Sequence, residues 1–188
     1  MPILKIARMG HPILNQISQP VIDPTAPEVS RLISAMIETM EDAKGTGLAA
    51  PQVHMPWRIV VYKVIAERED TGENGGVPTT AIINPVIKPL GDDTNVAFEA
   101  CLSVPGMAGP VSRFNKIGLT YQNIIGETVE CEAEGFHARV LQHECDHLDG
   151  VLYPMRMEDM SQFGFIEEMG KNNENEGSEQ HREEVSDE

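Results

Sequence analysis

Two histidines and a glutamate stand at the spacing of a catalytic metal site, in the stretch His143-Glu144-Cys145-Asp146-His147. Residues four apart share one face of an α-helix, so the imidazoles of His143 and His147 can converge on one ion. The Glu144 carboxylate then lies beside the ion, where it can accept a proton from water without being a ligand. The pattern favours such a site over a surface helix whose two histidines face solvent.

The residues around this motif indicate a helix. Apolar and motif residues recur at helical intervals: Phe136, Val140, Leu141, Glu144 and Leu148. Gly150 follows, where a left-handed C-terminal cap is expected. The prediction is a helix of roughly 12 to 14 residues, about 20 Å long, that fixes the relative positions of the motif side chains.

The third metal ligand is open at this point, because three kinds of site supply different candidates. Past His147 the chain follows the metzincin pattern up to Gly150, but Tyr153 stands where the third histidine belongs. A thermolysin-like protease would use a downstream carboxylate, and this chain offers Glu158, Asp159, Glu167 and Glu168. The remaining candidate is Cys101, at the end of a predicted strand. A thiolate with two histidines gives three ligands and one open position.

Three motifs of this sequence resemble those of the peptide deformylase family, and they occur in the same order. They are Gly45-Thr46-Gly47-Leu48-Ala49-Ala50-Pro51-Gln52, Glu99-Ala100-Cys101-Leu102-Ser103 and Gln142-His143-Glu144-Cys145-Asp146-His147. The resemblance extends from about residue 3 to about residue 165. Ala100 departs from the pattern, since the second motif normally has glycine there. We expect Ala100 to be in extended backbone, where a methyl group is tolerated.

The resemblance implies a metal-dependent hydrolase that removes the N-formyl group from the formylmethionine of newly made proteins and releases formate. It implies that Cys101, His143 and His147 hold one divalent metal, with Fe(II) expected and Zn(II), Ni(II) or Co(II) able to occupy the site. Glu144 would be the general base. A zinc endopeptidase and an inactive peptide-binding relative stay open as alternatives.

The resemblance also suggests how the substrate is held. The Gln52 side chain and the Leu102 backbone N–H would stabilise the oxyanion. Backbone around Gly47 and Gly106 would pair with N-formylmethionyl peptides or nascent chains as an added strand. Candidates for the wall of the methionine pocket, one or two turns before His143, are Phe136, Arg139 and Val140.

Glu99 and Arg113 are expected to form a partly buried pair that holds the cysteine strand rigid. Cys131 alternates with Val129 and Ala133 along a predicted strand, and we expect it in the core. Cys145 lies far around its helix from the two histidines and is expected to pack against neighbouring elements.

The expected fold is α+β, with short, mostly antiparallel strands packed around the central helix that carries the H-E-x-x-H motif. A first helix should begin with residues 25–28 as a capping box and with Pro27 in its first turn. Residues 160–169 are expected to form a short helix. The segments expected to be extended are 45–50, 57–65, 82–90, 94–102, 117–122 and 128–134, and residues 67–78 should form a polar loop.

Composition limits the remaining possibilities. The 188 residues, 40% apolar, predict one catalytic domain over residues 1–170 and an acidic disordered tail over 171–188. The net charge of −16 argues against nucleic-acid binding, because phosphates would be repelled. The apolar runs are too short to span a membrane, and the first residues lack a targeting pattern. We therefore expect a cytoplasmic protein with no membrane association.

Overall fold

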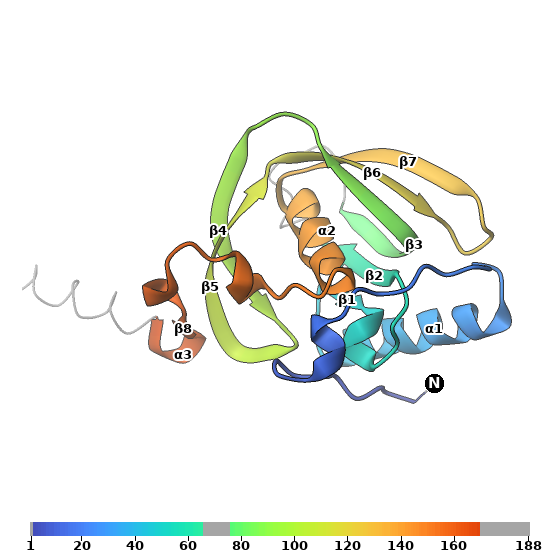
Figure 1. Cartoon of the computed structure of the whole chain (residues 1–188), viewed down its shortest axis with the longest axis horizontal. Helices are drawn as coiled ribbons and strands as arrows, with labels where there is room; N and C mark the ends of the chain where they lie inside the picture. The colour runs from blue at the N-terminus through green and yellow to red at the C-terminus, as the bar shows by residue number, and fades with distance from the viewer. Residues whose placement is uncertain (1, 66–75, 170–188) are drawn as a thin grey trace, which may run out of the picture.

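The computed structural model describes residues 2–65 and 76–169, and Figure 1 shows their arrangement. Most of the predicted polar loop and the whole predicted tail at 171–188 lie outside the described residues.

Within the described ranges, two antiparallel sheets surround a central helix, as expected. The first sheet has the order β1-β2-β3-β6-β7. Its strands are β1 (Gly47–Ala49), β2 (Ile59–Val64), β3 (Val77–Pro89), β6 (Lys116–Gln122) and β7 (Thr128–Glu134). The second sheet has the order β4-β5-β8. Its strands are β4 (Thr94–Cys101), β5 (Val104–Phe114) and β8 (Gly164–Phe165).

Three α-helices and four short 3-10 helices connect or cover these strands in the described part of the chain. The α-helices are α1 (Pro27–Asp42), α2 (Gly135–Leu148) and α3 (Ile166–Met169). The 3-10 helices are η1 (Pro12–Asn15), η2 (Ala50–Val53), η4 (Tyr153–Arg156) and η5 (Met160–Gln162). None of the described helices is long and apolar enough to cross a membrane.

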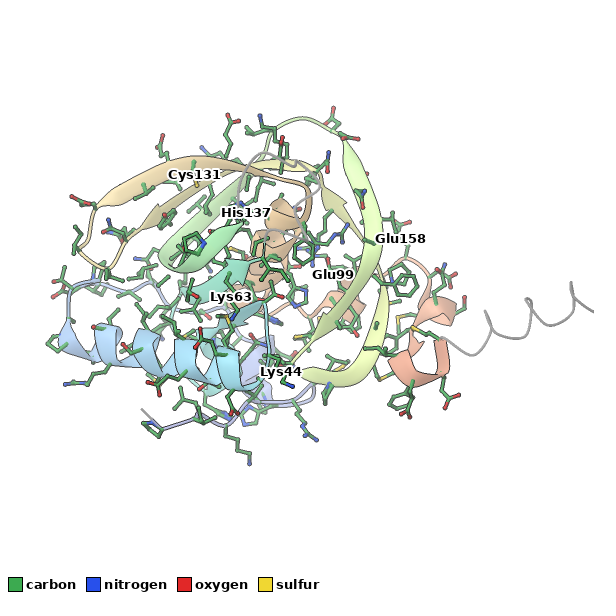
Figure 2. The ribbon with its side chains drawn as sticks, turned by 180° about the vertical axis from the view of Figure 1, so that it is seen from behind. Lys44, Lys63, Glu99, Cys131, His137 and Glu158 are labelled. Atoms are coloured by element: carbon green, nitrogen blue, oxygen red, sulfur yellow. The ribbon has the colours of Figure 1, made fainter. Side chains whose placement is uncertain are left out.

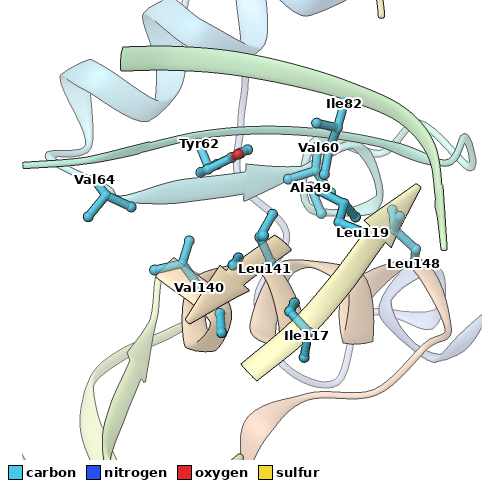
Figure 3. Close-up of a cluster of buried hydrophobic side chains, with 12 residues drawn as sticks. Ala49, Val60, Tyr62, Val64, Ile82, Ile117, Leu119, Val140, Leu141 and Leu148 are labelled. Carbon is cyan, nitrogen blue, oxygen red and sulfur yellow. The ribbon is translucent and has the colours of Figure 1, made fainter. Parts of the chain in front are cut away.

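Helix α2, which carries the motif, lies against the five-stranded sheet. Figure 3 shows Leu141 and Leu148 among the sheet residues of this cluster, and both leucines are fully buried. Replacing such a leucine by alanine costs about 2–5 kcal/mol. Gly150, with φ of 73°, supplies the predicted left-handed turn after the helix. Packing along one face thus holds the motif helix in place.

The predicted capping box of α1 is wrong, although Pro27 does open the helix. The N-cap is Ala26, which makes no side-chain cap. Thr25 instead donates both its backbone N–H and its hydroxyl to Asp23, at 2.9 and 2.7 Å. The nearby carboxylate therefore competes successfully for the threonine.

Two further expectations are corrected. Cys131 is exposed, because β7 is the last strand of its sheet and α2 covers only the end of β7 near Ala133, which is buried (Figures 1 and 2). Residues 160–169 form η5, β8 and α3 rather than one helix. Pairing of Gly164 with Ala108 and of Phe165 with Met107 interrupts any helix there.

The amino-terminal segment has no strand, yet its backbone is hydrogen-bonded to three distant parts of the chain. Ala7 N donates to Gln52 O at 2.7 Å, and Met9 N donates to Ser103 O at 2.7 Å. Ser18 N donates to Leu148 O at 2.8 Å, at the end of α2. The segment therefore joins three segments that carry predicted site residues.

Candidate active site

Cys101, His143 and His147 converge where β4 ends beside α2. Each offers one ligand atom, and these atoms lie within 4.8 Å of one another. Cys101 Sγ is 3.3 Å from His147 Nε2. Bonds of about 2.0–2.3 Å to a metal place ligand atoms roughly 3–4 Å apart, so the group fits an ion.

The other candidates for a third ligand lie elsewhere. In residues 2–65 and 76–169, the only such group of histidine, cysteine and carboxylate ligands is the one that contains Cys101. The four downstream carboxylates, all exposed, are Glu158, Asp159, Glu167 and Glu168. Tyr153 is buried beside His143, with ring centroids 6.1 Å apart, and its hydroxyl donates to Met107 O. The geometry favours the thiolate.

Glu99 orients the His143 ring. Its Oε2 lies 2.8 Å from His143 Nδ1. Because an ionised carboxylate only accepts, Nδ1 carries the proton and the Nε2 lone pair is left for an ion. Burial raises the pKa of Glu99, but hydrogen bonds from His143 and Arg113 outweigh burial and lower that pKa to about 2.

The predicted pair of Glu99 and Arg113 is present and buried. Arg113 donates Nε to Glu99 Oε1 and Nη2 to Oε2, both at 2.9 Å. Figure 2 shows Glu99 in the interior of the molecule. A two-pronged hydrogen bond fixes the carboxylate in its plane, so the contact to His143 is held in one geometry.

The predicted substrate residues line one cavity of about 520 Å³ that also contains His143 and Glu144. These residues are Gly47, Gln52, Leu102, Gly106, Phe136, Arg139 and Val140. Arg139 differs from the other two pocket-wall candidates, because its guanidinium bonds Glu99 Oε1, Val111 O and Asn95 O at 2.8, 2.9 and 2.6 Å. Its guanidinium is therefore bonded to protein acceptors, while Arg139 also borders the cavity.

The Gln52 side chain is oriented by a hydrogen bond to its carboxamide oxygen. Oε1 accepts from Ala49 N at 2.8 Å, which leaves Nε2 on the side of Cys101. Nε2 lies 3.1 Å from Ser103 Oγ and 3.6 Å from Cys101 Sγ. The side chain that was predicted to donate to an oxyanion is therefore a donor next to the metal-ligand group.

Ser103 and Asp146 have roles that the sequence analysis missed, although both stand inside quoted motifs. Ser103 N donates to Cys101 Sγ at 3.4 Å, and Asp146 accepts from Arg113. Burial raises the pKa of Cys101, but nearby His147 and His143 outweigh burial and lower it well below the ordinary thiol value. The surroundings of Cys101 thus favour the thiolate, which is the form that binds metal.

Glu144 is buried in the same cavity. Burial raises the pKa of this carboxyl. Among the described residues, none hydrogen-bonds its Oε2 atom. A carboxylate of raised basicity with an unpaired oxygen can accept a proton and return it.

Ala100 lies in β4, paired with Ala108 of β5, and is not among the described residues with positive φ. The expectation of extended backbone is confirmed. Ala100 is exposed and borders the cavity, and the strand register shifts between Ala100 and Cys101.

The sequence model of the polypeptide deformylase family matches residues 3–163. This chain belongs to the peptide deformylase family. Members of the family are metal-dependent hydrolases that remove the formyl group from N-terminal formylmethionine.

Known peptide deformylases are similar to this chain over most of its length. Peptide deformylase 2 of Ralstonia nicotianae is 45% identical over 167 residues, 88% of this chain and 92% of the relative. A peptide deformylase structure from Ehrlichia chaffeensis superposes with a TM-score of 0.79 at 32% identity, covering 86% of this chain and 91% of that one. A Met-Ala-Ser-bound deformylase of Acinetobacter baumannii gives 0.76 at 33% identity, covering 83% and 99%.

Proposed function

We propose that Cys101, His143 and His147 hold one divalent metal and that Glu144 transfers the proton during deformylation. The observation that carries this proposal is the convergence of three ligand atoms within 4.8 Å, in a cavity that also contains the unpaired oxygen of Glu144. A metal held there would polarise the formyl carbonyl and lower the pKa of water.

The substrate is an N-formylmethionyl peptide or nascent chain, as the Met-Ala-Ser-bound relative suggests. Each sheet contributes a terminal strand to the cavity, β1 through Gly47 and β4 through Cys101. An extended peptide can pair with such strand edges. The methionine side chain then lies against Phe136 and Val140, while the backbone near Gly47 and Gly106 aligns the formyl group.

Glu144 accepts a proton from the water that adds to the formyl carbon. The same carboxyl delivers this proton to the amine nitrogen as the C–N bond breaks, so that formate and a free amino terminus leave. A buried carboxyl with a raised pKa suits both steps.

Negative charge on the formyl oxygen is stabilised by Gln52 Nε2 and the Leu102 backbone N–H. The Gln52 donor is supported by its fixed carboxamide, 3.6 Å from Cys101 Sγ. Leu102 directly follows Cys101 and borders the same cavity. Donors that are already oriented lower the barrier without reorganisation.

The native ion is proposed to be Fe(II), as the family resemblance implies. One thiolate and two imidazoles also accept Zn(II), Ni(II) or Co(II). Peptide deformylases are generally cytoplasmic, and the same location is proposed for this chain. The net charge of −16 argues against direct nucleic-acid contact.

Formate release from formyl-Met-Ala-Ser tests the proposal, with protein purified anaerobically and its metal content measured. We expect formate in proportion to bound metal, and none after removal of the metal. Cleavage of internal peptide bonds would indicate an endopeptidase. Peptide binding without either reaction would indicate an inactive relative.

A further inference from the structure

Charged side chains continue outward from the Glu99 contact with His143. Arg113 uses Nε and Nη2 for Glu99, and it donates its remaining nitrogen, Nη1, to Asp146 Oδ2 at 2.6 Å. Asp146 belongs to α2, about one turn after His143. A single arginine therefore joins two buried carboxylates, and only one of them touches a histidine of the metal-ligand group.

Arg156 of η4 holds the other side of Asp146. It donates Nε to Oδ2 at 2.9 Å and Nη2 to Oδ1 at 2.5 Å. The side chain of Arg156 is 48% exposed, whereas that of Asp146 is 9% exposed and those of Arg113 and Glu99 are 4% exposed. Arg156 is thus the solvent-facing end of the series, and it supplies two of the three hydrogen bonds shown for the Asp146 carboxylate.

We propose that Arg156 is a positioning residue for the metal site, acting through Asp146, Arg113 and Glu99 on the orientation of His143. The inference rests on the proposed metal ligands. Without Arg156, the buried Asp146 carboxylate keeps one donor, and a buried acceptor that loses its partners is costly. Arg113 then turns toward Asp146 and its two-pronged hold on Glu99 loosens. Arg139 still bonds Glu99 Oε1 at 2.8 Å, so the orientation of His143 is held less firmly but is not lost.

A purely structural role makes a different prediction. If Arg156 only fastens η4 to α2, its loss lowers the melting temperature without changing how fast metal leaves. Arg58 supplies a matched control, because its Nη1 bonds Asp149 Oδ1 at 2.7 Å, just past the end of α2. Among the described contacts, Arg58 has no hydrogen bond to Glu99, Arg113 or Asp146.

The test loads wild type, Arg156→Met, Arg156→Lys and Arg58→Met with Co(II) and follows transfer of the ion to excess EDTA. We expect Arg156→Met to release Co(II) roughly threefold to tenfold faster, less than the 10–100-fold typical for a direct partner of a ligand. Arg156→Lys should fall between, since lysine keeps the charge but not the planar fork. Arg58→Met should match wild type in release, even where its metal-free form melts lower.

A second variant, Asp146→Asn, tests the route. If Arg156 acts through Asp146, adding Arg156→Met to Asp146→Asn gives no further acceleration. Three results would overturn the inference while leaving the metal site intact. The double variant could release Co(II) faster than either single variant, Arg58→Met could accelerate release as much as Arg156→Met, or both Arg156 variants could release Co(II) at the wild-type rate. Wild-type protein that retains no Co(II) would overturn the metal site itself, and the inference with it. If Arg156→Met does not fold, the Co(II) release rate of Arg156→Lys is compared with that of wild type instead.

Discussion

The Glu144 carboxylate packs directly against Gly47, so that a β-carbon at position 47 would overlap Glu144 Oε1. Position 47 does not have a left-handed φ, and the need for glycine is therefore one of space. The sequence suggested that this glycine admits a peptide backbone. The structure shows that it also makes room for the predicted base.

Gly47→Ala should lower kcat/KM by about 10²-fold. The added methyl group would displace the Glu144 carboxylate, and a small misplacement of a catalytic group is enough for a loss of this size. Metal content should not change. Gly118→Ala is the control, since an added β-carbon there meets only Leu90, at the ordinary distance of 3.7 Å. Steady-state deformylation with formyl-Met-Ala-Ser measures both variants, and equal activity would show that Glu144 has room to shift.

Glu144→Gln should keep the metal and lose turnover by about 10² to 10⁴, because it removes the proton acceptor without removing a ligand. Metal analysis and kcat must be measured on the same sample. Near-normal kcat with full metal occupancy would rule out Glu144 as the base.

Cys101→Ser should weaken metal binding, since a hydroxyl replaces a soft thiolate poorly. Cys131→Ser serves as the control because Cys131 is exposed on β7. After dialysis against a chelator, the first variant should be depleted of metal and the second should not. Full occupancy in Cys101→Ser would mean that another group completes the site.

Ala100→Gly should change kcat/KM by less than about threefold, under 1 kcal/mol in barrier. The reason is that Ala100 already pairs with Ala108 in β4 and does not have a positive φ, although the register shifts just after it. A tenfold or larger gain from a nearly inert wild type would identify the natural chain as a peptide-binding relative.

Patterns local in sequence predicted most of the helices and strands and the pair of histidines, whereas Cys101 was assigned as the third ligand by the family resemblance. The spacing of His143 and His147 sets their shared helix face, and the apolar intervals set the helix itself. Contacts with partners distant in sequence could not be predicted from such patterns. Arg139 bonds Glu99 and Val111, which no helical period can indicate. Coverage of Cys131 likewise depends on how far α2 reaches along β7.

Competition between nearby groups explains the smaller errors. Thr25 has a suitable position for a cap, but the Asp23 carboxylate takes its hydroxyl. Phe165 has the right surroundings for a helix, but pairing with Met107 of β5 holds it extended. Strand pairing between segments far apart in the chain depends on tertiary contacts. A prediction made from neighbouring residues alone has no information about these contacts.

The hydrogen bonds of the amino-terminal segment bear on the order of assembly. Ser18 can donate to Leu148 only after α2 has formed, and Met9 can donate to Ser103 only after the residues that follow β4 have been synthesised. Contacts between such distant positions are slow to form, because the intervening chain must first be closed into a loop. On the ribosome, this segment is synthesised before the elements that it contacts, so it is fixed in place only after they have formed.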